Sequence, residues 1–214
     1  MTINVNEIFH SIQGESLDAG LPCVFIRLSG CNLRCSYCDT RYAWENGIPM
    51  ELGEIEERIA FFHCNLVEIT GGEPLFQAET PMLISRLVTL GYKVLLETNG
   101  SLDIGRVDEN CIKIMDIKCP SSGESEAFVL RNLSLLNPRD QIKFVIADEQ
   151  DYRFSKNRLP LISPHLAMDH VLFSPAYGKL PLDRLAGWIL SDGLKVRLHL
   201  QLHKIIWPGI EKGV

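Results

Sequence analysis

The chain has 214 residues, of which 46% are hydrophobic, which is enough to bury one substantial core and predicts a single domain over residues 1–214. Its formal net charge of −6 argues against the broad basic surface that drives nucleic-acid binding, and no apolar run approaches the roughly 20 residues that span a bilayer. Seven cysteines without a secretion signal indicate a reducing compartment, so we expect a cytoplasmic protein that acts on a small molecule.

Short β-rich runs alternate with helical patterns along the chain. Strands are predicted at 24–28, 66–70, 93–97, 112–116, 142–146, 170–173 and 195–200. Helices are predicted near 52–62, 83–90, 124–135, 149–158 and 181–191. This alternation predicts an α/β fold with a parallel sheet and crossover helices. Because a complete eightfold barrel typically needs about 250 residues, we expect an open, partial β/α barrel of about six parallel strands.

Three cysteines, Cys31, Cys35 and Cys38, lie within one eight-residue loop after the first predicted strand. Three thiolates at this spacing can converge on one inorganic centre, and they leave one iron of a four-iron cluster without a cysteine ligand. Structural zinc normally takes four protein ligands, and a redox pair would leave one cysteine without a role. The spacing therefore favours an iron–sulfur cluster with an open iron. The other four cysteines match no cluster position and are expected to be buried or incidental thiols: Cys23, Cys64, Cys111 and Cys119.

Polar residues and glycines follow the predicted strands at their carboxyl ends, where open parallel sheets bind ligands. Gly71 and Gly72 allow a tight turn and a close approach of the backbone to a ligand, and Glu73 offers a carboxylate to a cationic amine. Weaker candidates end the later strands: Glu97, Asn99, Asp116, Lys118 and Ser174. We expect all of these residues to ring one cavity.

The cysteine loop, with Tyr37 before its last cysteine, resembles the cluster loop of the radical S-adenosylmethionine (SAM) superfamily. The resemblance implies a [4Fe–4S] cluster on the three cysteines, with SAM on its open iron. An electron from the reduced cluster would cleave SAM, and the resulting 5′-deoxyadenosyl radical would abstract a hydrogen atom. By position, the residues implied to bind SAM are Tyr37, Cys38, Asp39, Gly72, Glu97, Asp116, Ile117, Lys118 and Ser174.

Two terminal segments, 9–15 and 201–208, together with Arg27 and Asp39–Thr40, resemble the 7-carboxy-7-deazaguanine synthase family of the queuosine pathway. The resemblance implies that 6-carboxy-5,6,7,8-tetrahydropterin is converted to 7-carboxy-7-deazaguanine with ring contraction and loss of ammonia, and that SAM is regenerated. It also implies Mg²⁺ at Thr40, an external electron donor and a homodimer. The terminal segments would cap the substrate, which is implied to contact Ile12, Gln13, Gly14, Arg27, Thr70 and Pro208.

Two other functions remain open on the residues alone. A radical SAM activase would use the same cluster to place a radical on a large partner protein, and its cavity should stay open. An iron–sulfur or zinc regulatory module would perform no catalysis, and Thr40 and residues 70–74 would then share no task. In the resemblance, the Pro208 end closes the pocket, residues 209–214 extend beyond the match, and a lone His203 is most simply structural.

Overall fold

The computed structural model describes residues 1–214 and contains one nine-stranded sheet with the strand order β3-β1-β2-β4-β5-β6-β7-β8-β9. β1 pairs antiparallel with both β2 and β3, whereas every neighbouring pair from β2 to β9 is parallel. The strands are β1 (Thr2–Ile12), β2 (Pro22–Leu28), β3 (Ile48–Glu51), β4 (Leu66–Gly71), β5 (Lys93–Thr98), β6 (Ile112–Asp116), β7 (Gln141–Ile146), β8 (Val171–Pro175) and β9 (Arg197–Leu198). The sheet does not close, so the predicted open partial barrel is confirmed.

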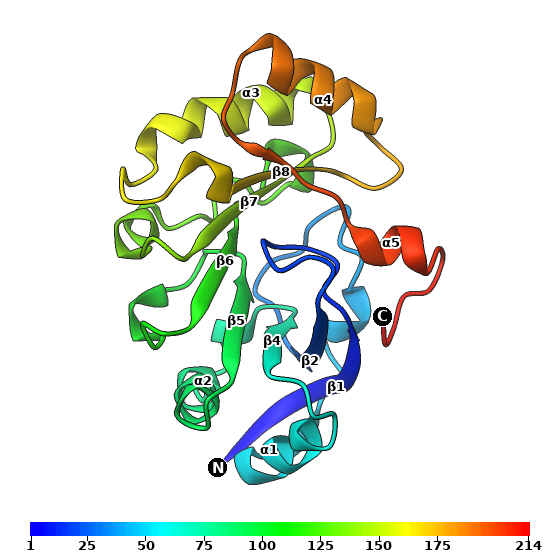
Figure 1. The fold of residues 1–214 in the computed structure, drawn as a ribbon, viewed down its shortest axis with the longest axis vertical. Coiled ribbons are helices and arrows are strands. Elements are labelled where there is room, and N and C mark those ends of the chain that lie inside the picture. Colours follow the sequence, from blue (N-terminus) through cyan, green and yellow to red (C-terminus); the bar gives the residue numbers. More distant parts are fainter.

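Four of the five helices connect consecutive strands and lie on the outer side of the curved sheet, whereas the fifth lies beside the N-terminal segment (Figure 1). They are α1 (Leu52–Ala60), α2 (Thr80–Thr89), α3 (Glu149–Arg158), α4 (Leu182–Ser191) and α5 (Leu202–Ile206). The inner side is left to the loops that follow the strands (Figure 1). No helix has the length and apolar character needed to cross a membrane.

The two faces of the sheet differ because side chains alternate along each strand. Outward-facing residues such as Val24, Ile69 and Leu96 pack against α1 and α2 in one cluster of 18 buried residues, and a second cluster of 18 joins β6, β7 and β8 to α3 and α4. The inner face carries a cluster of only five buried hydrophobic residues, which includes Phe25 and Leu95. Its remaining positions are polar, which leaves room for a site.

Some predicted elements were wrong. The helix predicted at 124–135 is a series of turns followed by a 3-10 helix at Leu130–Leu135. There the Asn132 side chain donates hydrogen bonds to the carbonyls of Gly100 and Leu102, at 3.0 and 2.7 Å, which ties the segment to the preceding loop. The strand predicted at 195–200 shortens to Arg197–Leu198, and β1, β3 and α5 were not predicted.

Candidate active site

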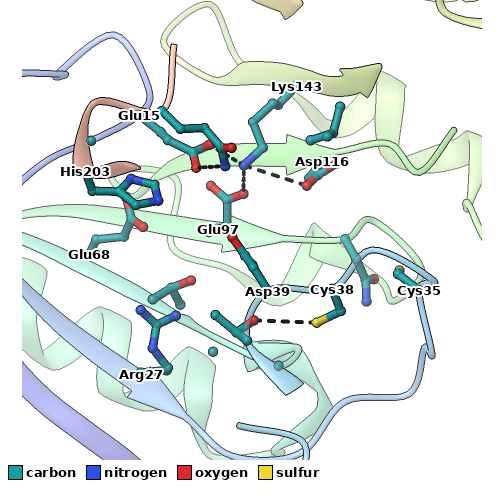
Figure 2. A pocket seen from close by; sticks show the side chains of 18 of the residues that line it. Glu15, Arg27, Cys35, Cys38, Asp39, Glu68, Glu97, Asp116, Lys143 and His203 are labelled. Carbon is teal, nitrogen blue, oxygen red and sulfur yellow. Dashed lines mark hydrogen bonds and ion pairs between the residues drawn. The ribbon is translucent and has the colours of Figure 1, made fainter. Parts of the chain in front are cut away.

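A cavity of about 320 Å³ lies at the carboxyl ends of the parallel strands on the inner face, and it collects most of the predicted site residues (Figure 2). The predicted residues that line it are Ile12, Gln13, Gly14, Arg27, Cys31, Cys35, Tyr37, Cys38, Asp39, Thr40, Thr70, Gly72, Glu97, Asn99, Asp116, Lys118 and His203. Figure 2 shows the cysteines on one side of the cavity, with Arg27, Glu68 and His203 on the other. The cavity therefore has a sulfur side and a polar side.

Strand alternation explains why charged residues reach this cavity. Glu68, Glu97 and Asp116 occupy inward positions of β4, β5 and β6, and their flanking residues point outward into the core. Lys143 occupies the corresponding inward position of β7 and pairs in register with Asp116. Because neighbouring strands place these positions side by side, four charged side chains from four strands converge on one wall.

The cysteine loop has an inner and an outer side. Cys31, Leu33, Cys35 and Tyr37 line the cavity, and all three loop cysteines are free thiols. Burial raises the pKa of the Cys31 thiol and raises that of the Cys35 thiol to about 11. Metal binding by such thiols must release protons, since only thiolates ligate metals. Nowhere do three or more His, Cys, Asp or Glu side chains lie close enough together to hold a single metal ion.

The glycines after β4 are required by close contact with β2 and the cysteine loop. Gly71 has a φ of 149°, and a Cβ atom there would lie 2.1 Å from the Leu28 carbonyl oxygen. At Gly72 a Cβ atom would lie 2.2 Å from the Gly30 carbonyl oxygen and 2.8 Å from Cys31 Cβ. Only glycine allows the backbone of 71–72 to pass this close to the loop that carries the cysteines.

The carboxylate of Glu73 does not face the cavity, which corrects the expectation that it offers a site for an amine. It is fully buried and accepts hydrogen bonds from Leu75 N at 3.0 Å, Thr98 Oγ1 at 2.8 Å and Asn99 N at 2.7 Å. Burial raises its pKa, against the effect of these three donors. Glu73 therefore organises the strand ends, and any contact to a ligand amine falls to backbone groups of 71–72.

Lys143 is the centre of the charged wall (Figure 2). Its Nζ lies 2.7 Å from Glu15 Oε2 and 3.7 Å from Asp116 Oδ2, and it also donates to Glu97. Burial opposes the charged form of this lysine, but the three carboxylates outweigh it and hold the Lys143 pKa well above its usual range. Burial likewise opposes ionisation of Glu15, but Lys143 and two histidines lower the Glu15 pKa.

Two carboxyls of the wall favour their protonated form. Burial, reinforced by the nearby Glu97 carboxylate, raises the pKa of Glu68 to about 8. Burial also raises the pKa of Glu97 to about 7, although Lys143 opposes the rise. Glu68 accepts a hydrogen bond from Gln13 Nε2, which fixes its orientation. At neutral pH a protonated Glu68 can donate a hydrogen bond as well as accept one.

Arg27 is held at the rim by the N-terminal strand. Its Nε donates to Glu7 Oε1 at 2.7 Å, and its guanidinium lies 5.7 Å from the Phe9 ring and 5.8 Å from the Tyr42 ring. Tyr42 Oη also donates to Glu7 Oε1, at 3.0 Å. The Nη atoms of Arg27 make no hydrogen bond within the chain, so the outer edge of its fork is available to a ligand.

The two ends of the chain meet along one wall of the cavity. Leu202 N donates to Gly14 O at 2.9 Å, and Gln201 Nε2 donates to Glu15 Oε1 at 2.9 Å. A Cβ atom at Gly14 would lie 2.3 Å from His203 Nδ1, so the His203 ring packs directly on the glycine. His203 also lines the cavity, where burial lowers its pKa.

Three predicted positions lie outside the cavity lining. Pro208 is exposed, because the chain turns at Gly209, with a φ of 79°, and returns to bring Val214 into the lining instead. Ile117 is buried in the outer core, and Ser174 is fully buried in β8. The Ser174 hydroxyl oxygen has no hydrogen-bond partner, and neither has Oδ1 of Asp116.

These orphaned atoms bear on whether a cluster and SAM fit here. Buried polar atoms are almost always hydrogen-bonded, so partnerless oxygens at a cavity wall indicate a polar ligand. The opposite wall supplies three free thiols, the usual ligands of an iron–sulfur cluster. The donor set therefore fits a cluster beside a polar organic cofactor.

Several lining residues were not predicted: Glu15, Glu68, Lys143, Gln201 and Lys204. Glu68 and Lys143 carry a signal in the sequence, since each is a lone charge within an otherwise apolar strand. A charge in such a strand is expensive unless it is paired or faces a site.

Residues 25–119, from β2 to just past β6, match the Radical SAM superfamily. The fold, the cysteine loop and the cavity thus define the class of protein as radical SAM. A 7-carboxy-7-deazaguanine synthase of Koribacter versatilis is 43% identical over 99% of this chain and 100% of its own length, and one of Chlorobaculum tepidum is 46% identical over 99% and 97%. The chain belongs to the 7-carboxy-7-deazaguanine synthase family. A crystal structure of QueE from Escherichia coli, 22% identical, shares the fold with a TM-score of 0.79 over 94% of each chain.

Proposed function

We propose that this protein converts 6-carboxy-5,6,7,8-tetrahydropterin to 7-carboxy-7-deazaguanine, with ring contraction and loss of ammonia. The observation that carries the proposal is the single cavity in which three free cysteines face a polar wall built from both terminal segments. Relatives with this activity in their names, 43% and 46% identical over 99% of the chain, support it. A [4Fe–4S] cluster bound by the three cysteines supplies the electron that cleaves SAM into a hydrogen-abstracting radical.

The residues of the chain bind and orient the two organic molecules. On the sulfur side, Tyr37, Asp39, Gly72 and Asp116 would contact SAM, and the orphaned Asp116 Oδ1 is a free acceptor for it. Other contacts to SAM would come from Cys38, Glu97, Ile117, Lys118 and Ser174, where Ile117 can offer only backbone atoms because its side chain is in the core. This polar shell keeps SAM in one orientation against the cluster.

On the opposite side, the free edge of the Arg27 fork would bind the pterin carboxylate, since a guanidinium matches a carboxylate with two parallel hydrogen bonds. Residues 12–14 and Thr70 would meet the pterin ring, and protonated Glu68 would donate to a ring acceptor. The segments at 9–15 and 201–204 would cap the substrate, with Pro208 outside the cap. One Thr40 oxygen would join Mg²⁺, which fills its octahedron with substrate oxygens and water.

The remaining expectations concern the setting of the enzyme. We propose that it acts in the cytoplasm as a homodimer, and that a separate protein supplies its electrons. The chain contains seven cysteines, all of them free thiols, which suits a reducing compartment.

Anaerobic reconstitution with iron and sulfide, followed by incubation with carboxytetrahydropterin, SAM, Mg²⁺ and dithionite, tests the proposal. We expect a deazaguanine product with SAM recovered unchanged. The Cys35→Ala variant should lose bound iron and product, whereas Cys119→Ala, which removes a cysteine outside the cavity, should keep both. SAM cleavage without any deazaguanine product would reject the substrate assignment and retain the radical SAM class.

A further inference from the structure

The cysteine loop is a wall one residue thick between the cavity and solvent. Its odd-numbered residues from Cys31 to Tyr37 line the cavity, whereas Asn32, Arg34 and Ser36 are exposed on the other side. The cavity itself is enclosed elsewhere by strands, helices and the two terminal segments. An electron that enters from outside therefore has its shortest path to the cysteine sulfurs through the outer side of this loop.

Two arginines cover that outer side. Arg34 Nη1 donates to the carbonyls of Cys31 and Leu33, both at 2.8 Å, and Arg41 Nη2 donates to the Ser36 carbonyl at 2.6 Å. Both guanidiniums stack on Trp44, at 4.7 and 5.8 Å from its ring centre. The two positive charges are thus held rigidly against the loop backbone.

The positive charge of this surface is not neutralised within the chain. Neither arginine forms an ion pair, and neither does the exposed Lys179, whose Nζ lies 5.1 Å from the Tyr37 ring on the same loop. The nearest carboxylate, Glu124, accepts from the backbone amide of Arg34 at 2.7 Å. The whole protein carries 27 acidic and 21 basic residues, so an unpaired basic collar here is a local reversal of sign.

We propose that this collar, Arg34, Arg41 and Lys179, is the docking surface for a small acidic electron-carrier protein. The inference rests on the proposed function, which requires one electron per reduction of the centre that the cysteines hold. In the step the carrier is oxidised by one electron and the centre is reduced by that electron, with no bond formed and no proton transferred. Acidic carriers are attracted to a positive patch and repelled by the rest of an acidic protein, which selects this face and speeds encounter.

The fixed geometry of the two arginines serves the same purpose. Complexes between electron-transfer proteins bury little area and dissociate quickly, so their specificity depends on charge placed at the point of transfer. Arg34 and Arg41 put that charge on the carbonyls of the cysteine loop itself. A docked carrier would face the sulfurs across a single layer of backbone.

The test uses the reconstituted holoenzyme and a purified acidic FMN flavoprotein of the flavodoxin class as the probe. Binding of the oxidised flavoprotein is measured by calorimetry at low and high ionic strength. Reduction of the cluster by the flavoprotein hydroquinone is followed by stopped-flow absorbance, with dithionite as a reductant that needs no docking. The Arg34→Gln/Arg41→Gln variant should lower the affinity and the second-order reduction rate by about tenfold or more at low ionic strength.

Matched variants separate charge from structure. Arg34→Lys/Arg41→Lys keeps both charges and should retain binding within about threefold, and Arg131→Gln removes an exposed, unpaired arginine elsewhere and should change nothing. Equal binding and reduction by wild type and the double Gln variant would overturn the proposal. Equal losses in the Lys and Gln variants would also overturn it, because loop packing would then explain the effect. Dithionite-driven product formation reports separately on the proposed function.

Discussion

Replacing Gly72 with alanine tests whether the cysteine loop must lie where the structure places it. The new Cβ atom would be 2.2 Å from the Gly30 carbonyl oxygen, whereas ordinary contacts begin at 3.4 Å. The loop therefore has to move by about 1.2 Å. The move also strains the hydrogen bond from Glu73 N to Gly30 O, which is 2.8 Å long.

A displacement of about 1 Å at a reacting centre costs roughly 10²-fold in rate, or about 2.7 kcal/mol of activation free energy. Overpacking of this kind adds roughly 1–3 kcal/mol of instability. We therefore expect the Gly72→Ala enzyme to fold, to bind iron less completely and to turn over at least about 100-fold more slowly with dithionite.

Iron content, SAM affinity by calorimetry and single-turnover product formation measure these effects separately. Gly53→Ala is the matched control, because a Cβ atom there meets nothing within 4 Å and alanine favours the α1 helix by roughly 0.5–1 kcal/mol. A Gly72→Ala enzyme with wild-type iron content, SAM affinity and turnover would refute the reasoning, since it would show that the loop can shift without cost.

The remaining predictions concern the charged wall and the rim. Lys143→Met should lower the free energy of unfolding by about 3–5 kcal/mol, measured by urea titration, because it leaves buried carboxylates unpaired; the exposed Lys195→Met should be neutral, and equal stabilities would contradict the pairing. Glu7→Gln should raise KM for the carboxylated pterin about tenfold with little change in kcat, since Arg27 loses the partner of its Nε; an unchanged KM would separate Arg27 from substrate binding. The pKa of Glu68 is raised on folding to about 8, so the folded state binds the extra proton and stability falls as pH rises from about 5 to 8, by up to about 1.4 kcal/mol per pH unit; Glu68→Gln should remove that share of the slope in denaturation curves across this range, and an unchanged slope would reject the shift.

The parallel strands could be predicted because they are short apolar runs that end in recognisable polar residues, as at Glu97 and Asp116. The first strand was missed although Ile3 and Val5 alternate with polar residues, since its later part reads as a ligand-binding motif. The helix predicted at 124–135 failed for a tertiary reason. The side chain of Asn132 takes its partners from a loop about thirty residues earlier, and local periodicity carries no trace of that contact.

The sulfur side of the site was largely readable, and the polar side was not. The spacing of Cys31, Cys35 and Cys38 is local, so the sequence displays it directly. The pairing of Lys143 with Glu15 joins residues 128 positions apart, and only the register of β6 and β7 brings Asp116 to the same point. Lone charges in apolar strands announce that a partner exists, but they do not say which residue it is.

The wall shared by the two chain ends also sets the order of events during synthesis. The hydrogen bond between Gln201 and Glu15 joins positions 186 residues apart, and His203 packs on Gly14 from the same segment. A growing polypeptide therefore completes β1 to β8 and the cysteine loop well before that wall can form. Until the last helix leaves the ribosome, the three thiols face an open bay, and the machinery that delivers iron and sulfide meets them before the door is hung.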